Sequence, residues 1–348
     1  MIDTSKEVEM IKGTLVKVLK NNAFKAVFTG FTATTLSLGL TACGPIERVK
    51  SVFAEDAIPP MPAPEVATYV LDLSGSTNPT AQLEALGSGI SDFIAGRSLG
   101  NPFAKTVEAP RGLSIQFITT NAAQAPRIVL VSTQTSQDLY RFVSENVPNL
   151  EGSRQLWNGL INARTQIWQD SKFGASLTGC IEQVVQSLGK QQLLSDALQE
   201  PARLVCQDAI KTANALERLN NFVANPTVDV GSDVEGAITI GLKNLINSKS
   251  EFPSARLTLV VASDLIDEVG LDLPRKLQGV DSKAACSFGT KDASRITADY
   301  SEVSVVLVGA RNSVASTQLL DQVSTYWSCY FSQIGITNIE EKSDLSGF

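Results

Sequence analysis

Three oxygen-bearing side chains at alternate positions, Asp72, Ser74 and Ser76, have the types and spacing that could bind a metal ion. They follow residues 67–71, whose Tyr, Val and Leu favour a β-strand. Gly75 gives the chain freedom to turn there, and a turn would let the carboxylate and the two hydroxyls converge on one point. Oxygen ligands without Cys or His suit Mg²⁺, or alternatively Mn²⁺ or Ca²⁺. The alternative interpretation is a strand followed by a solvated, Ser-rich turn.

The composition excludes several classes of protein. The 348 residues include no His, so the chain by itself cannot form a Ser-His-Asp or Cys-His hydrolase or a His-ligated metal centre. Because it also offers no credible pair of general acid and base, we expect that it is not an enzyme. Acidic residues outnumber basic ones, 36 to 29, which argues against nucleic acid as a partner. A hydrophobic content of 43% is enough for a sizeable core.

The first 42 residues have the order of a bacterial export signal peptide. Lysines are scattered through residues 1–25, and residues 26–40 then run without a charge but are too short to span a bilayer comfortably. The sequence Leu-Thr-Ala-Cys that ends at Cys43 resembles the lipobox of bacterial lipoproteins. The resemblance implies cleavage before Cys43, acylation of that residue and anchoring in the cell envelope, at the outer membrane or the periplasmic face rather than in the cytoplasm. An ordinary buried helix with a chance Cys is the alternative.

Two further features fit an exported chain. Residues 43–65 include an acidic, Pro-rich stretch that we interpret as a semi-rigid linker after the lipid anchor. Four other cysteines remain, an even number that suggests disulfides with three possible connectivities. We favour Cys180 with Cys206, which flank a predicted helical hairpin, and Cys286 with Cys329, which lie in the later part of the chain. Four free, buried thiols are the alternative.

The elements that must position Asp72 and its neighbours alternate between strands and helices. Residues 136–225 are predicted to be helical almost throughout. On both sides of this stretch, apolar runs or an alternation of apolar and polar residues predict strands, and apolar residues at helical spacing predict helices. The predicted strands are residues 67–72, 113–119, 127–132, 256–262 and 301–309, and the predicted helices are residues 79–96, 232–245 and 316–334. This order indicates an α/β fold with a mostly parallel central sheet and helices on both faces.

Three separated segments together resemble a von Willebrand factor A (VWA) domain, a Rossmann-like fold with a metal-ion-dependent adhesion site (MIDAS) built from three loops. Asp-Leu-Ser-Gly-Ser at 72–76 matches the first loop without departure. Ser232 resembles the second, because Ala and Ile follow it five and six residues later, and Asp264 after the strand at 256–262 resembles the third. The resemblance implies Mg²⁺ held by Asp72, Ser74, Ser76, Ser232 and Asp264.

The sequence departs from the family's pattern at two positions. Ser232 stands where the family has Thr, which keeps the hydroxyl but loses the methyl that stiffens the side chain. Leu265 stands where the family usually has Gly, which leaves the geometry of that loop open. The nearby Asp267 and Glu268 are expected to be solvated loop acids rather than additional metal ligands.

The resemblance implies a VWA domain over residues 66–340, interrupted by a helical insertion at about 136–225 and followed by a tail at 341–348. For its function we expect an envelope-anchored module that binds a protein partner in a metal-dependent way. Hydroxyls and water-mediated carboxylates would leave one position on the ion open, and a Glu or Asp carboxylate of the partner would fill it best. The alternative is a structural component of an envelope assembly with a vestigial metal site.

Overall fold

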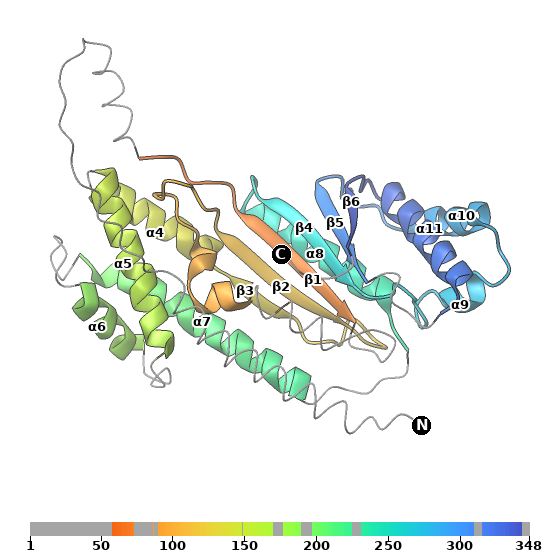
Figure 1. Cartoon of the computed structure of the whole chain (residues 1–348), viewed down its shortest axis with the longest axis horizontal. Coiled ribbons are helices and arrows are strands. Elements are labelled where there is room, and N and C mark those ends of the chain that lie inside the picture. Colours follow the sequence, from red (N-terminus) through yellow and green to blue (C-terminus); the bar gives the residue numbers. More distant parts are fainter. Residues whose placement is uncertain are drawn as a thin grey trace, which may run out of the picture.

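A six-stranded β-sheet forms the centre of the computed structural model (Figure 1). The structure describes residues 58–72, 86, 90–147, 149–169, 177–188, 197–224, 231–309 and 315–342. The strands are β1 (Glu65–Asp72), β2 (Arg111–Ile118), β3 (Ile128–Val131), β4 (Arg256–Ala262), β5 (Val303–Val308) and β6 (Ile339–Lys342). The helices are η1 (Arg97–Leu99), α4 (Thr133–Asn146), α5 (Leu150–Gln169), α6 (Leu177–Leu188), α7 (Gln199–Ala224), α8 (Val234–Glu251), α9 (Leu273–Lys276), α10 (Ser282–Ala293) and α11 (Thr317–Gln333).

The strands are ordered β3-β2-β1-β4-β5-β6, and all neighbours are parallel except β2 and β3. The chain thus runs outward from β1 to β3, returns to β4 beside β1, and runs outward again to β6. The central strands are largely apolar and buried, as expected where helices cover both faces of a parallel sheet. The predicted α/β class is confirmed, and β2 and β3 form the antiparallel pair at one edge of the sheet.

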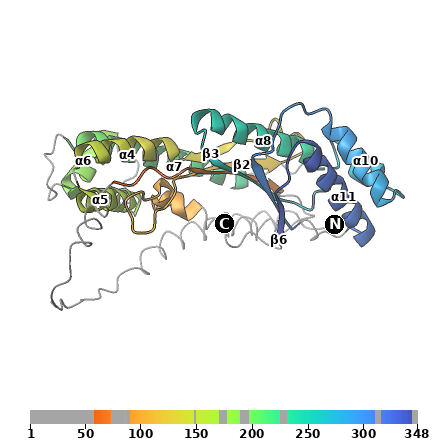
Figure 2. The same cartoon turned by 90° about the horizontal axis from the view of Figure 1, so that it is seen from above.

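Helices cover both faces of the sheet (Figure 2). On one face, α8 packs on the strands around residues such as Leu242, and α10 and α11 contribute side chains to the same apolar core. On the other face, Ile90, which lies in the helix that precedes η1, packs with Leu216 and Leu219 from the second half of α7. The block predicted as an insertion at 136–225 is therefore not separate from the sheet, because its last helix also covers one of the faces.

The helices α4, α5 and α6 and the first half of α7 form a helical block beside the sheet (Figure 1), with a core that includes Trp157 and Val184. An ion pair crosses its interior: Arg164 of α5 lies 2.8 Å from Asp208 of α7, measured between Nη2 and Oδ2, and the two side chains are 0% and 1% exposed. Arg164 Nη1 also donates to the carbonyl of Ile94, at 2.9 Å. One buried guanidinium thus joins α5, α7 and the helix that leads into η1.

The four described cysteines form two disulfides, in the pairing that the sequence favours. Cys180 and Cys206 join α6 to α7 inside the helical block, and both are buried. Cys286 and Cys329 join α10 to α11 on the face of the sheet that α8 also covers. Each bond links two helices that already lie against one another, so it constrains the unfolded chain more than it shapes the folded one.

The first and last strands of the sheet extend by one and two residues beyond the range 66–340 that was predicted for the VWA domain. The linker predicted to extend through residue 65 overlaps β1, which begins at Glu65, and its last part packs onto the helical block. There Tyr140 Oη donates to the carbonyl of Pro59, at 2.7 Å, and Ile58 lies against the core of the block. The tail predicted from residue 341 overlaps β6. Charged residues dominate β6, an edge strand, and this hid its strand character in the sequence.

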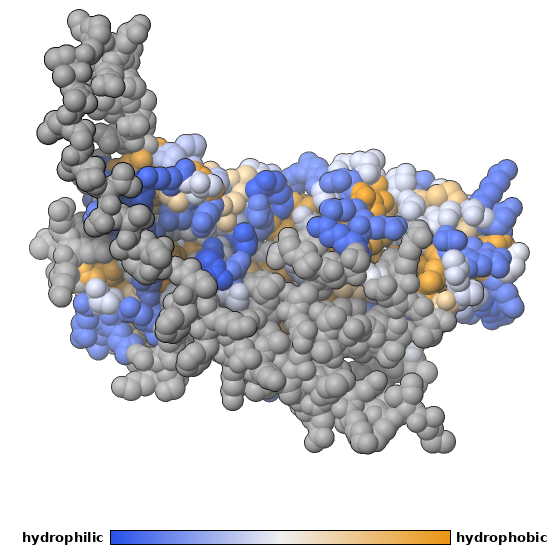
Figure 3. All heavy atoms as spheres, viewed as in Figure 1, coloured by the Kyte–Doolittle hydropathy of each residue, from blue (hydrophilic) through white to orange (hydrophobic). Residues whose placement is uncertain are grey.

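Hydrophilic and hydrophobic residues are interspersed on the described part of the face drawn in Figure 3. The large apolar side chains that are exposed among the described residues are Val107, Val131 and Val269. Within the same ranges, none of the helices combines the length and the apolar character that crossing a membrane requires. Cys43 and the predicted signal peptide lie outside the described residues.

Candidate metal centre

The carboxyl ends of β1 and β4 bring two of the predicted ligands to the same edge of the sheet. Leu71 of β1 pairs with Ala262 of β4, so Asp72 and Ser263 are the next residues on two adjacent parallel strands. Ser263 Oγ donates to Asp72 Oδ2 at 2.8 Å, and Asp264 follows directly. The strand order reverses between β1 and β4, which is the position where open α/β sheets most often bind ligands.

Asp264 holds a carboxylate oxygen whose hydrogen-bonding capacity the described structure does not use. The residue is only 2% exposed. Its Oδ1 accepts a hydrogen bond from the backbone N–H of Ile266 at 3.1 Å, whereas Oδ2 is buried without any hydrogen-bond partner among the described residues. Because an unmatched buried polar atom costs about 1–3 kcal/mol, such an atom calls for an explanation. A bound cation would supply the missing interaction.

The start of α8 places Ser232 near the same edge. Asp233 caps the helix, since its Oδ1 accepts from the backbone N–H of Gly236 at 2.9 Å. The other oxygen accepts from Ala122 N, and Asp233 N donates to the carbonyl of Thr119 just after β2. Ser232, 5% exposed, is thereby held at the carboxyl end of the sheet. Ser74 and Ser76 lie outside the described residues.

The backbone conformation at Leu265 is one that Gly adopts with less strain. Its φ is +63°, in the left-handed region that residues with a Cβ rarely adopt. Two contacts hold this conformation: Leu265 N donates to Ser263 Oγ at 3.0 Å, and Trp327 Nε1 donates to the carbonyl of Leu265 at 2.9 Å. The side chain is 1% exposed and belongs to the core beneath α8 and α11. The loop is therefore ordered by α11 despite its departure from the family's pattern.

Leu265 allows a direct test of this backbone conformation. Leu265→Ala loses buried apolar volume, at a cost of about 2–5 kcal/mol, and keeps a Cβ in the unfavourable region. Leu265→Gly loses the same contacts but releases about 1–2 kcal/mol of strain. We therefore expect the Gly variant to be the more stable of the two and both to be less stable than the wild type, as measured by urea unfolding. An Ala variant as stable as the Gly variant would show that the positive φ is not maintained.

Asp267 and Glu268, which follow in the same loop, differ in exposure, although both were expected to be solvated. For Asp267 that prediction is wrong, because its side chain is 0% exposed. Burial raises the pKa of the Asp267 carboxyl, and hydrogen bonds from the backbone N–H groups of Glu235, Leu271 and Gly270 oppose that rise. Glu268 is exposed, as expected. Partial burial raises its pKa, and the negative charges of the nearby acidic residues, with Asp264 and Asp72 first among them, add to the rise.

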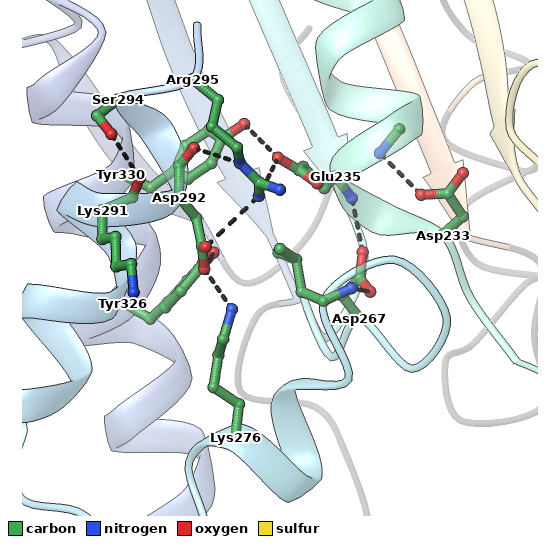
Figure 4. Close-up of polar contacts among 12 residues, drawn as sticks. Asp233, Glu235, Asp267, Lys276, Lys291, Asp292, Ser294, Arg295, Tyr326 and Tyr330 are labelled. Atoms are coloured by element: carbon green, nitrogen blue, oxygen red, sulfur yellow. Dashed lines mark hydrogen bonds and ion pairs between the residues drawn. The ribbon is translucent and has the colours of Figure 1, made fainter.

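A polar network continues from the start of α8 to α10 and α11 (Figure 4). Tyr330 Oη donates to Glu235 Oε1 at 3.2 Å, and Tyr326 Oη donates to Asp292 Oδ2 at 2.9 Å. Arg295 Nη2 lies 3.5 Å from a carboxylate oxygen of both Glu235 and Asp292. Burial raises the pKa of Glu235, and the charge of Arg295 opposes the rise. The network joins the N-terminal turn of α8 to α11 and to Arg295, just after α10.

The sequence alone did not indicate the roles of Ser263 and Asp267. The signal for Ser263 was a hydroxyl at the end of an apolar strand, next to Asp264. For Asp267 there was no comparable local signal, because its partners Glu235 and Leu271 are backbone N–H groups and one of them lies 32 residues away in the chain.

No protein-family model, curated protein or solved structure matches this chain. The chemistry of the site therefore has to be judged from its own residues. In the described part of the chain, no three side chains of Asp, Glu, Cys or His form a group that could hold a metal ion. Asp72, Asp264 and Ser232 lie at the same edge of the sheet and bring two carboxylates and one hydroxyl to it, and oxygen groups of this kind would fit a hard cation such as Mg²⁺.

Proposed function

We propose that the chain is a VWA-type, divalent-cation-dependent module that binds a protein partner at the bacterial cell envelope, where a lipid on Cys43 anchors it. The observation that carries the proposal is the buried Oδ2 of Asp264, which has no hydrogen-bond partner among the described residues and lies one residue beyond the Ser263 that is bonded to Asp72. The reversal of strand order at that position and the placement of Ser232 at the same edge support it.

The proposed roles follow from the chemistry of each side chain. Asp72 and Asp264 supply negative charge, directly or through water, and Ser232 supplies a neutral hydroxyl, as Ser74 and Ser76 would from the first loop. The cation, Mg²⁺ in the first place and Mn²⁺ or Ca²⁺ as alternatives, would present a positive centre to the partner. Because the hydroxyls are neutral and the carboxylates would act in part through water, little negative charge of the site would contact the ion directly. A Glu or Asp carboxylate of the partner is therefore the favoured incoming ligand.

Asp264→Asn tests whether Asp264 is a metal ligand or a residue needed only for stability. The amide replaces a buried carboxylate oxygen that lacks a partner, so we expect the metal-free variant to be at least as stable as the metal-free wild type. A free Mg²⁺ concentration of about 100 times its Kd should stabilise the wild type by about 2.7 kcal/mol and the variant not at all. Thermal unfolding with Mg²⁺ and with EDTA measures both effects.

The matched control is Asp281→Asn, because the side chain of Asp281 caps α10 rather than bonding to either ligand loop, so its replacement should not alter the response to Mg²⁺. In a capture experiment from envelope extract, a partner should be retained by the wild type with Mg²⁺ and lost with EDTA or Asp264→Asn. Equal responses to Mg²⁺ in Asp264→Asn and the wild type would contradict the proposal. A wild type that binds no cation but retains its partner would favour the structural alternative.

A further inference from the structure

The loops that carry two of the proposed ligands are joined to each other through their backbones. The carbonyl of Ser232 accepts from Glu268 N at 3.0 Å and from Val269 N at 3.4 Å. Ser232 is a proposed ligand, and both donors lie in the loop that begins with Asp264. The position of Ser232 is therefore coupled to the loop after β4 rather than to α8 alone.

The carboxylate of Asp267 makes a second connection between the same loops. Its Oδ2 accepts from Glu235 N, in the first turn of α8, at 2.8 Å (Figure 4). Its Oδ1 accepts from Leu271 N, in its own loop, at 2.6 Å. The backbone carbonyl of Asp267 accepts from Leu273 N at 2.8 Å, which fixes the residue to the start of α9. With the side chain fully buried, both oxygens are committed, one to each loop.

We propose that Asp267 is the positioning residue of the cation site, which holds the Ser232 loop against the Asp264 loop before any ion binds. The inference rests on the proposed function and deepens it. Ser232 lacks the stiffening methyl of a Thr, so its hydroxyl depends more on its surroundings for a fixed position. A buried acceptor that binds the first turn of α8 from the neighbouring loop provides that order, as residues behind metal ligands commonly do.

Asp267→Asn should break the connection with little change of shape. Glu235 N and Leu271 N bind different oxygens of Asp267, so in the variant one of them would face the amide NH₂, which cannot accept a hydrogen bond. Asp281 is the matched control. Its Oδ1 accepts from Ala284 N at 2.8 Å at the start of α10, so Asp281→Asn makes the same chemical change at another helix N-terminus.

Two measurements test the inference, and one of them needs no metal. In the metal-free protein, Asp267→Asn should speed amide hydrogen exchange at 231–236 and 268–271 by about tenfold or more, the equivalent of one lost buried hydrogen bond. Asp281→Asn should leave the exchange of both segments unchanged. The Kd for Mn²⁺, measured by electron paramagnetic resonance, should rise about 10–100-fold in Asp267→Asn and stay near the wild-type value in Asp281→Asn.

The possible results lead to different conclusions. Unchanged exchange at 231–236 in Asp267→Asn would overturn the connection itself. Faster exchange with a Kd for Mn²⁺ equal to that of Asp281→Asn would overturn the positioning role. A wild type that does not bind Mn²⁺ would refute the proposed function and the positioning role with it, while the exchange data would still decide whether Asp267 joins the loops.

If Asp267→Asn does not fold, the connection can be broken from the other side. Glu235→Pro removes the N–H that Asp267 accepts, and a proline is tolerated in the first turn of a helix. Glu235→Ala removes the same side chain but keeps that N–H. The Pro variant is expected to bind Mn²⁺ about tenfold or more weakly than the Ala variant, and equal affinities of the two would overturn the inference.

Discussion

Asp208→Asn is expected to lower the free energy of unfolding by about 3–5 kcal/mol, because it leaves the charge of Arg164 buried without its counter-ion. Arg164 has no exposed surface through which water could compensate. Its Nε and Nη2 both donate to Asp208 Oδ2, at 3.0 and 2.8 Å, and Nη2 also reaches Thr212 Oγ1 at 3.3 Å. Urea unfolding followed by circular dichroism measures the loss.

A double replacement separates the value of the pair from the cost of breaking it. Arg164→Met with Asp208→Leu removes both charges and keeps similar volumes, so it should be much closer to the wild type than Asp208→Asn. It should still lose about 1–3 kcal/mol, because the carbonyl of Ile94 loses the donor Arg164 Nη1. If the single variant is as stable as the wild type, the pair does not stabilise the packing of α5 against α7.

Loss of the Cys286–Cys329 disulfide is expected to cost about 4 kcal/mol, from the 43 residues that separate the two cysteines in the chain. The fold should persist, because α10 and α11 pack closely without the bond. At Gly289 of α10, a Cβ would lie only 2.2 Å from the carbonyl oxygen of Tyr326, an approach that only glycine permits. Guanidinium unfolding of a Cys286→Ala, Cys329→Ala variant measures the cost.

The second disulfide provides an internal comparison. Cys180 and Cys206 are 4% and 0% exposed, whereas Cys286 and Cys329 are partly exposed. A mild reductant should therefore open Cys286–Cys329 first, since thiol–disulfide exchange requires access to a sulfur. Mass spectrometry after alkylation identifies the pair that reacts. Earlier reduction of Cys180–Cys206 would mean that the helical block opens more readily than its packing implies.

Local patterns in the sequence were sufficient for most of the sheet and for the two cysteine pairs. Buried parallel strands must be apolar along their whole length, so runs such as Leu-Thr-Leu-Val-Val-Ala at 257–262 identify β4. The same reasoning failed for β6, where an edge strand tolerates Glu340 and Glu341. It also passed over α10, whose close packing at Gly289 uses small residues in place of a stripe of large ones.

The sequence pattern indicated that Arg164 is buried but did not identify its partner in the ion pair. Arg164 continues the apolar stripe of Trp157, Leu160 and Ile161 at helical spacing, so its place on a buried face could be read from the sequence. That its partner would be Asp208 depended on how α5 packs against α7, and this is a matter of tertiary structure.

By itself the sequence determined the α/β class and the positions of Asp72 and Asp264 at or just beyond the ends of their strands, and it predicted a set of oxygen ligands suited to a hard cation. It could not distinguish Asp267 from Glu268, two adjacent acids in one loop. Only the tertiary structure buries Asp267, because backbone N–H groups of α8 and of its own loop take the place of water around the carboxylate. The same structure leaves Glu268 exposed. Hydrogen-bond donors that lie far away in the chain decide which carboxylate can be buried, and no local pattern records them.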